Sequence, residues 1–185
     1  MFIQTDTTPN PNALKFMPGQ PIANTPAYFL TIEDARASFL ARKIFSIRAV
    51  DSVFFGADFI TVSKKEEGNW EILKPEVIMT IMDHFTSGLA AFDFEQEGES
   101  APEGQAYTGE IEKQIIEIIE TRVRPAVAMD GGDITYKGFK DGIVTLELRG
   151  ACSGCPSSTI TLKNGIESML KHYVPEVQSV EAVNS

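Results

Sequence analysis

The feature that most constrains this chain is an acidic stretch near its middle, residues 91–110. It carries six Asp and Glu, no Lys or Arg, and several Gly, Pro and Ser. Such residues favour turns, and too few apolar side chains are present to offset the entropy lost on ordering. We therefore expect an acidic flexible linker over residues 91–109 that keeps two folded domains, residues 1–90 and 110–185, apart.

The charge on either side of the stretch supports this division. Of the net charge of −10, −6 lies in residues 91–110 and −2 in each flank. A chain with this charge repels a phosphate backbone, so no nucleic-acid partner is expected. With 43% hydrophobic residues the chain can bury a core, and no apolar run approaches the roughly 18 residues of a membrane span. Composition thus predicts a soluble globular protein with no membrane partner.

The first domain has the pattern of a small α+β fold. Two prolines in the T-P-N-P-N segment at residues 8–12 forbid a helix and predict a turn between strands. Apolar residues after Pro75 recur at helical spacing, as in a helix that lies on a sheet. The expected elements are strands at residues 2–7 and 14–17, a helix at residues 33–46, a hairpin at residues 53–62 and a helix that opens at Pro75.

The second domain predicts the element order αββαβ, again an α+β layer. Its first helix shows apolar residues at intervals of three and four, and its two central strands are joined by Asp141-Gly142. The expected elements are a helix from residue 111 to the D-G-G-D break at residues 130–133, strands at 134–139 and 143–148, a helix at 157–173 and a strand at 177–183.

The chain contains only two cysteines, Cys152 and Cys155, in a C-x-x-C motif between a strand and a helix. Gly150 and Gly154 flank the thiols with residues that tolerate unusual backbone angles. Pro156 suits a first helical turn. The partial positive charge of a helix N-terminus favours thiolate, so these cysteines are expected to react or to bind a metal.

Three kinds of function are open for this motif. The cysteines can be buried small hydrophobes, but these have no reason to share a Gly-rich, Pro-terminated loop. A thioredoxin-type dithiol is the main alternative, although two antiparallel strands precede the motif where a βαβ entry is typical. The third is a metal site. Zinc or an iron–sulfur cluster needs four ligands, so two chains would have to contribute two thiolates each.

Two segments resemble a known family. T-P-N-P-N-A-L-K-F at residues 8–16 resembles the opening of the Nfu-type N-terminal domain. Residues 110–183 resemble the C-terminal NifU-like domain of iron–sulfur scaffold proteins. The motifs that carry this resemblance are V-R-P at residues 123–125, D-G-G-D at 130–133 and L-R-G-A-C-S-G-C-P-S-S at 148–158. Together the two segments cover almost the whole chain, which looks like an Nfu-family cluster scaffold or carrier.

This resemblance implies a [4Fe–4S] cluster that Cys152 and Cys155 of each of two subunits bridge. It implies a homodimer when loaded, upstream cluster assembly proteins as donors and apo iron–sulfur proteins as recipients. No further cysteines are available for a separate assembly domain or a permanent cluster. The chain is accordingly expected to act late, as a carrier and not as an enzyme, with a thiol-disulfide oxidoreductase as the alternative.

The remaining polar residues offer no catalytic centre. We expect the carboxylates of Asp130 and Asp133 to be solvated, His172 to interact with the dipole at the end of the last helix, and His84 to have no companion. No Ser/His/Asp set and no Gly-rich phosphate loop are present. Because residues 1–5 show no targeting pattern, a reducing cytoplasm is expected, with a mature organellar protein as the alternative.

Overall fold

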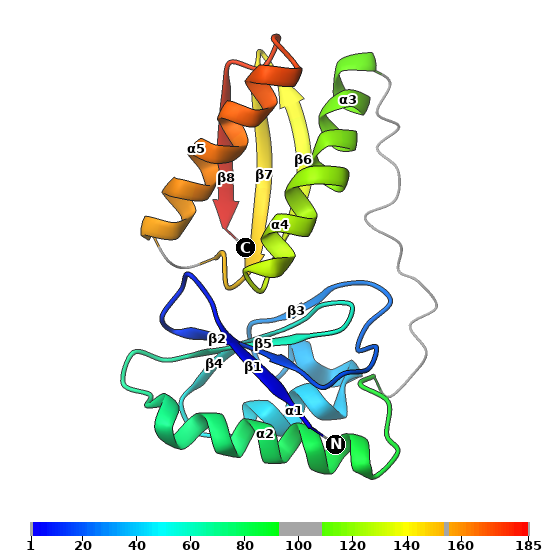
Figure 1. The fold of residues 1–185 in the computed structure, drawn as a ribbon, viewed down its shortest axis with the longest axis vertical. Coiled ribbons are helices and arrows are strands. Elements are labelled where there is room, and N and C mark those ends of the chain that lie inside the picture. The colour runs from blue at the N-terminus through cyan, green and yellow to red at the C-terminus, as the bar shows by residue number, and fades with distance from the viewer. Residues whose placement is uncertain (1, 93–108, 154–155, 185) are drawn as a thin grey trace.

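The computed structural model describes residues 2–92, 109–153 and 156–184 and places them in two α+β units stacked one above the other (Figure 1). Each unit has its own cluster of buried apolar side chains. The expected α+β class with two domains is thus confirmed. The predicted linker at residues 91–109 lies, except for its ends, outside the described residues.

The N-terminal unit is built on a five-stranded sheet in the order β1-β2-β5-β4-β3, in which all neighbours are antiparallel. The T-P-N-P-N segment forms the predicted turn between β1 and β2, where the Thr8 hydroxyl donates to the Ala13 carbonyl at 3.0 Å. The strand β3 was not predicted, because it has three residues and exists through pairing with β4. The strands are β1 Gln4–Thr7, β2 Ala13–Met17, β3 Ala27–Phe29, β4 Val50–Phe55 and β5 Ile60–Lys64.

Helices cover one face of this sheet. The single helix expected at residues 33–46 is instead a 3₁₀ turn, η1 (Asp34–Ala37), followed by α1 (Phe39–Phe45). Ser38 separates them because its backbone is extended and its hydroxyl accepts from the Ala41 N–H, as a helix cap does. The helix expected to open at Pro75 is α2 (Trp70–Thr86), which starts earlier because the Asn69 side chain caps the Glu71 N–H.

The C-terminal unit has the predicted order αββαβ. Its sheet has the order β6-β7-β8, with β6 and β7 antiparallel and β8 parallel to β7. Asp141 and Gly142 both have positive φ, as a two-residue hairpin turn requires. The elements are α3 Glu110–Ile118, η2 Ile119–Val123, α4 Arg124–Met129, β6 Gly132–Lys140, β7 Ile143–Gly150, α5 Pro156–Tyr173 and β8 Ser179–Asn184.

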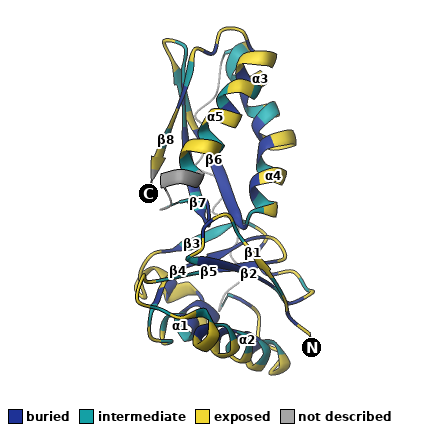
Figure 2. Ribbon diagram, turned by 60° about the vertical axis from the view of Figure 1, so that its left-hand side comes forward, coloured by how far each residue is buried: buried dark blue, intermediate teal, exposed yellow. Residues whose placement is uncertain are grey.

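The first helix of this unit is interrupted, contrary to expectation. Between α3 and α4 the π-helical turn η2 precedes Pro125, which has no N–H to continue the α-helical hydrogen bonds. Ile115, Ile119, Val123 and Val127 still fall on one buried face and pack in the core of the unit. In Figure 2, the central strands of both sheets are largely buried, and exposed residues lie on the outer sides of the helices.

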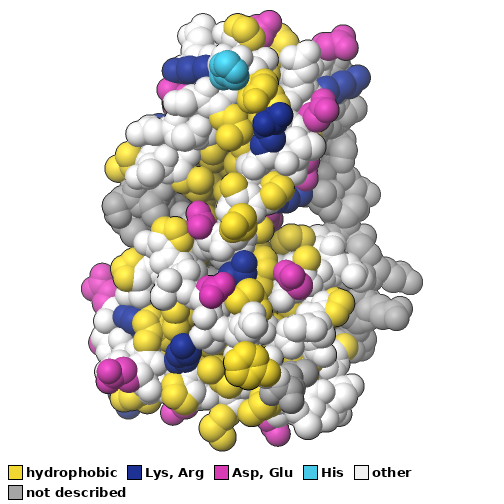
Figure 3. Space-filling view, viewed as in Figure 1, with side chains coloured by type: hydrophobic (Ala, Val, Ile, Leu, Met, Phe, Trp, Pro, Cys, Tyr) yellow, Lys and Arg dark blue, Asp and Glu magenta, His cyan; other side chains and the backbone are white. Residues whose placement is uncertain are grey.

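The two units are in contact through β4 and β5 of the N-terminal sheet and the lower end of β7 (Figure 1). The sequence predicted that the linker keeps the two domains apart. That separation is wrong for the structure, because hydrogen bonds join the two units. In the space-filling view, hydrophobic side chains gather in a strip along the upper unit (Figure 3). Among the helices of the described residues, none is long and apolar enough to cross a membrane.

Candidate functional site

The C-x-x-C motif lies in the short loop between the end of β7 at Gly150 and the start of α5 at Pro156. Pro156 begins the helix as the sequence predicted. The structure describes Cys152, whereas Cys155 lies outside the described residues. The convergence of the two thiols on one ligand therefore stays a prediction.

Two glycine turns shape the loop. Gly131 and Gly150 have φ of 78° and 70°, a conformation that other residues rarely adopt. The turns pack on each other, because the Ala151 N–H donates to the Gly131 carbonyl at 3.2 Å. A Cβ on Gly150 would lie 2.8 Å from the same Gly131 oxygen. The D-G-G-D segment thus ends a helix and starts a strand as expected, and it also supports the cysteine loop.

Gly132 provides the space for the Cys152 thiol. A Cβ on Gly132 would lie 2.6 Å from Cys152 Sγ, so the thiol occupies the volume that a side chain would fill. Cys152 is 5% exposed and belongs to the hydrophobic core of the C-terminal unit. The Thr159 hydroxyl donates to the Cys152 carbonyl at 3.2 Å, which ties the loop to the first turns of α5. Sequence reasoning missed this function of Gly132, which only the packing of β6 against the loop reveals.

The surroundings of Cys152 disfavour its ionised form. Burial raises the pKa of the thiol to about 12, and the carboxylates of Asp130 and Asp133 act in the same direction. The expectation that a helix N-terminus favours thiolate is thus wrong for Cys152 in this conformation. The thiol is protonated at neutral pH, and binding of a metal requires it to lose that proton.

Asp133 is held by Arg124 of the V-R-P segment. Its carboxylate Oδ1 lies 3.1 Å from Arg124 Nε, an ion pair without hydrogen-bond geometry, and Asp133 is 6% exposed. The expectation of a solvated carboxylate is therefore wrong for Asp133. Arg124 also donates to the Ile134 carbonyl at 3.0 Å and contacts Glu120 at 2.6 Å. These contacts fix α4 against β6 and so position the glycine turn between them.

The N-terminal unit reaches the same loop. The Tyr28 hydroxyl lies 2.9 Å from the hydroxyl of Ser153, the residue directly after Cys152. Thr61 donates from its hydroxyl to the Gly131 carbonyl at 2.7 Å. Lys15 donates from Nζ to the Ala128 carbonyl at 2.9 Å. Sequence reasoning did not find these residues, because contacts between separate domains leave no local pattern.

Neither histidine belongs to a metal-binding cluster among the described residues. His84 is 1% exposed, and its Nε2 lies 2.7 Å from the Ala90 carbonyl, so it does have a backbone partner. His172 lies in the last turn of α5, as predicted. Within the described ranges, no three His, Cys, Asp or Glu side chains gather to hold a metal ion. Any cluster site in the described part of one chain would therefore need ligands from elsewhere.

Comparisons with known proteins agree with the two-unit architecture. The model of the scaffold protein Nfu/NifU N-terminal domain matches residues 3–88, and that of the NifU-like domain matches residues 115–181. A solved structure of a NifU-like protein from Saccharomyces cerevisiae is 29% identical and covers 51% of this chain and 87% of its own, with a TM-score of 0.47.

Two curated relatives match almost the full length of the chain. One is named "NFU1 iron-sulfur cluster scaffold homolog, mitochondrial" from Homo sapiens, 54% identical over 99% of this chain and 72% of the relative. Another is "NifU-like protein 4, mitochondrial" from Arabidopsis thaliana, 49% identical over 98% of this chain. The chain spans 65% of the length of that second relative. With both halves matched in this way, the chain belongs to the Nfu family of iron–sulfur cluster scaffold proteins.

Proposed function

We propose that this protein carries a [4Fe–4S] cluster, bound between two subunits by Cys152 and Cys155 of each, and transfers it to apo iron–sulfur proteins. The cluster is the cargo of the protein. The observation that carries the proposal is that a member of a scaffold family has only two cysteines, both in one loop. Thiolate is the usual protein ligand of such clusters.

The homodimer follows from counting ligands. A cluster of this type needs four thiolates, and one chain supplies two. A two-fold axis that passes between two C-x-x-C loops brings four thiolates together. Such a site is held only while the dimer persists, which suits a ligand that has to leave.

The buried state of Cys152 suggests how the cargo is bound and released. To bind iron, the thiol must leave its place beside Gly132 and release its proton. During transfer, a thiolate of the recipient replaces one carrier thiolate at a time. A freed Cys152 then takes up a proton and returns to the core, where the neutral thiol is stable. This alternative state competes with the cluster and lowers the affinity of the carrier for it.

Donors, recipients and compartment belong to the same proposal. Upstream assembly proteins supply the cluster, and apo iron–sulfur proteins accept it. The human and Arabidopsis relatives are named as mitochondrial, so an organellar location is the alternative to the cytoplasm expected from the sequence. The thiol-disulfide oxidoreductase is less well supported, because burial raises the pKa of Cys152 and a protonated thiol is a poor nucleophile.

Anaerobic reconstitution tests the proposal. The protein is loaded with iron and sulfide, its iron, sulfide and zinc contents are measured, and sedimentation is compared before and after loading. We expect a coloured dimer that activates an apo iron–sulfur enzyme. A loaded species that stays monomeric without added thiol would contradict the bridging site. Catalytic reduction of a disulfide without metal, together with no transfer to any acceptor, would favour the oxidoreductase.

A further inference from the structure

The N-terminal sheet has a second face that does not belong to the core of its own unit. Side chains alternate along each strand, so in β5 Ile60 and Val62 join the core while Thr61 points to the opposite side. Phe54 is likewise absent from that core, yet it is only 1% exposed. Thr61 is also 1% exposed and Phe59 4%. Something outside the N-terminal core therefore covers this face.

The cover is the C-terminal unit, at the two glycine turns that support the cysteine loop. Thr61 hydrogen bonds to the Gly131 carbonyl, and a Cβ on Gly131 would lie 3.0 Å from Thr61 Oγ1. A Cβ on Gly150 would lie 3.2 Å from Phe54 Cδ1, so the ring packs against the bare backbone of the second turn. Side chains at these glycines would hold the two units apart.

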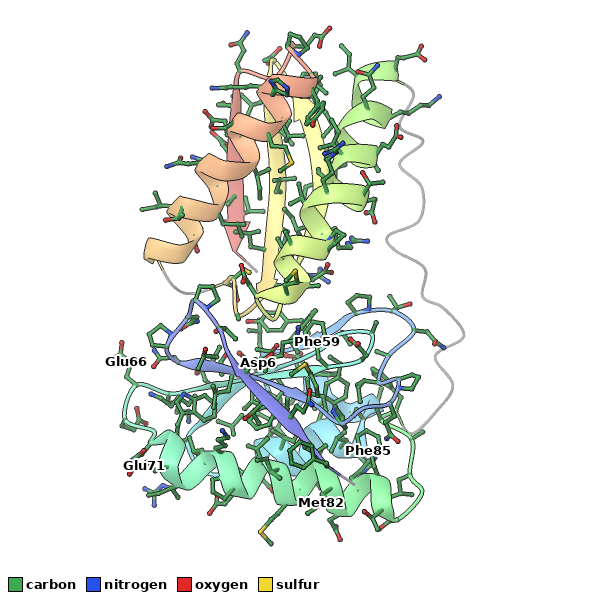
Figure 4. The ribbon with its side chains drawn as sticks, viewed as in Figure 1. Asp6, Phe59, Glu66, Glu71, Met82 and Phe85 are labelled. Atoms are coloured by element: carbon green, nitrogen blue, oxygen red, sulfur yellow. The ribbon has the colours of Figure 1, made fainter. Side chains whose placement is uncertain are left out.

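Basic and aromatic groups complete the contact. Lys15 Nζ lies 4.3 Å from the centre of the Phe59 ring and donates to the Ala128 carbonyl. Phe54 and Phe59 contact each other with ring centres 5.8 Å apart. In Figure 4, Phe59 lies on the side of the N-terminal sheet that faces the C-terminal unit, whereas Phe85 and Met82 lie on the side of α2.

We propose that this face of the N-terminal sheet, formed by Lys15, Tyr28, Phe54, Phe59 and Thr61, is a reversible cap over the cysteine loop of the same chain. The cap is docked while the loop is empty and leaves when the loop of a second copy approaches with a cluster. This inference rests on the proposed carrier function.

The two states exclude each other because they use the same surface. Ser153 directly follows Cys152, and its hydroxyl contacts Tyr28. A cluster bound through Cys152 would lie close to Ser153 and so to Tyr28, where the N-terminal sheet now stands. A partner loop cannot reach this position while the sheet is docked. Cluster and partner therefore bind the undocked state and shift the population toward it.

The contact has the composition of a reversible interface. Among the described residues, its hydrogen bonds come from the side chains of Lys15, Tyr28 and Thr61, which water solvates well when they are released. The buried rings of Phe54 and Phe59 supply apolar surface. Sixteen residues join Phe92 to Gly109, which reach roughly 55 Å at full extension. The units can thus separate, and redocking within one chain competes at an effective concentration on the order of millimolar.

The test uses two full-length variants with the same chemical change. Thr61→Arg places a charge in the docked face, where the new side chain meets Gly131. In an undocked N-terminal unit this face is open to solvent, so the variant unit should still fold. Thr86→Arg is the control, because Thr86 is exposed at the end of α2, on the other side of the sheet. Small-angle scattering and hydrogen exchange at residues 128–132 and 150–153 report docking in the metal-free protein.

We expect Thr61→Arg to have a larger radius of gyration than Thr86→Arg, because burying an unpaired charge disfavours the docked state. Hydrogen exchange at residues 128–132 and 150–153 should be about tenfold faster in Thr61→Arg than in Thr86→Arg. Cluster uptake in anaerobic reconstitution should also be faster by about tenfold. Equal scattering and exchange in the two variants would overturn the docked cap. Undocking without faster uptake would overturn its control of loading.

Failure of the carrier function is recognised separately. If the wild type and both variants take up no iron and sulfide, the function proposed above is wrong. Scattering and exchange would still decide whether the N-terminal sheet covers the loop. Unchanged circular dichroism and Trp70 fluorescence show that Thr61→Arg is folded, since Trp70 is the only tryptophan and lies in α2.

Discussion

Replacement of Gly132 by alanine tests whether the Cys152 thiol is packed in the core as described. The new methyl group would lie 2.6 Å from Cys152 Sγ and 2.8 Å from the Arg149 carbonyl oxygen. The sulfur can move, but the carbonyl belongs to the backbone of β7, which pairs with β6 at this point. The strands must therefore separate or the loop must shift.

The expected cost follows from packing energetics. Overfilling a packed site costs about 1–3 kcal/mol. The matched control is Gly138→Ala in the same strand, where a Cβ meets nothing within 4 Å. That change should stabilise the protein by roughly 0.5–1 kcal/mol, because glycine weakens a strand. The free energies of unfolding of the two variants should therefore differ by about 1.5–4 kcal/mol.

Urea unfolding of the metal-free protein, followed by circular dichroism, measures this difference. Trp70 fluorescence serves as an internal reference, because it reports the N-terminal unit. Displacement of the sulfur should also make Cys152 react faster with iodoacetamide, which peptide mass spectrometry can assign. If Gly132→Ala is as stable as Gly138→Ala and Cys152 reacts no faster, the thiol does not occupy the space beside Gly132.

Three further predictions concern the thiols and the ion pair that supports the loop. Because the pKa of Cys152 is raised from 9.0 to about 12, the neutral thiol stabilises the metal-free fold below pH 9. This contribution to the free energy of unfolding should fall by about 1.4 kcal/mol per pH unit between pH 9 and 12. In urea unfolding, Cys152→Ala should lack that part of the pH dependence. Replacing Cys152 or Cys155 by serine should abolish stable cluster binding, since a hydroxyl is a poor ligand for iron, whereas Ser153→Ala should retain iron and sulfide; a full cluster in Cys155→Ser would contradict the ligand assignment. Arg124→Leu should lower the free energy of unfolding by about 1–3 kcal/mol because it leaves the buried Asp133 without its cation. An additional Asp133→Asn change should recover part of the loss. If the effects of the two changes simply add in the double variant, the pair is not coupled.

Local patterns in the sequence were sufficient for most of the elements. The αββαβ order depends on apolar spacing within single segments, and Asp141-Gly142 predicts its hairpin through the backbone angles that it permits. The prediction of Pro156 as a helix start rests on the fixed φ of proline. The two domains were separable because charge and turn residues concentrate in one stretch. The family was recognisable because its motifs are contiguous.

The sequence predictions failed for elements that depend on segments distant in the same chain. The strand β3 exists because Ala27 and Phe29 pair with β4. Ser38 interrupts a helical pattern because its hydroxyl caps α1 and donates to the Ala91 carbonyl, 53 residues further along the chain. Neither effect is visible in a window of neighbouring residues.

The sequence by itself determined which thiols the chain has, because Cys152 and Cys155 are its only cysteines. The tertiary structure decided the state of Cys152: the helix N-terminus predicted a thiolate, but burial beside Gly132 and two carboxylates favour the protonated form. It also decided that Tyr28 and Thr61 reach the loop from the other domain. The ionisation of a thiol depends on the dielectric and the charges around it, and these come from segments that only folding brings together.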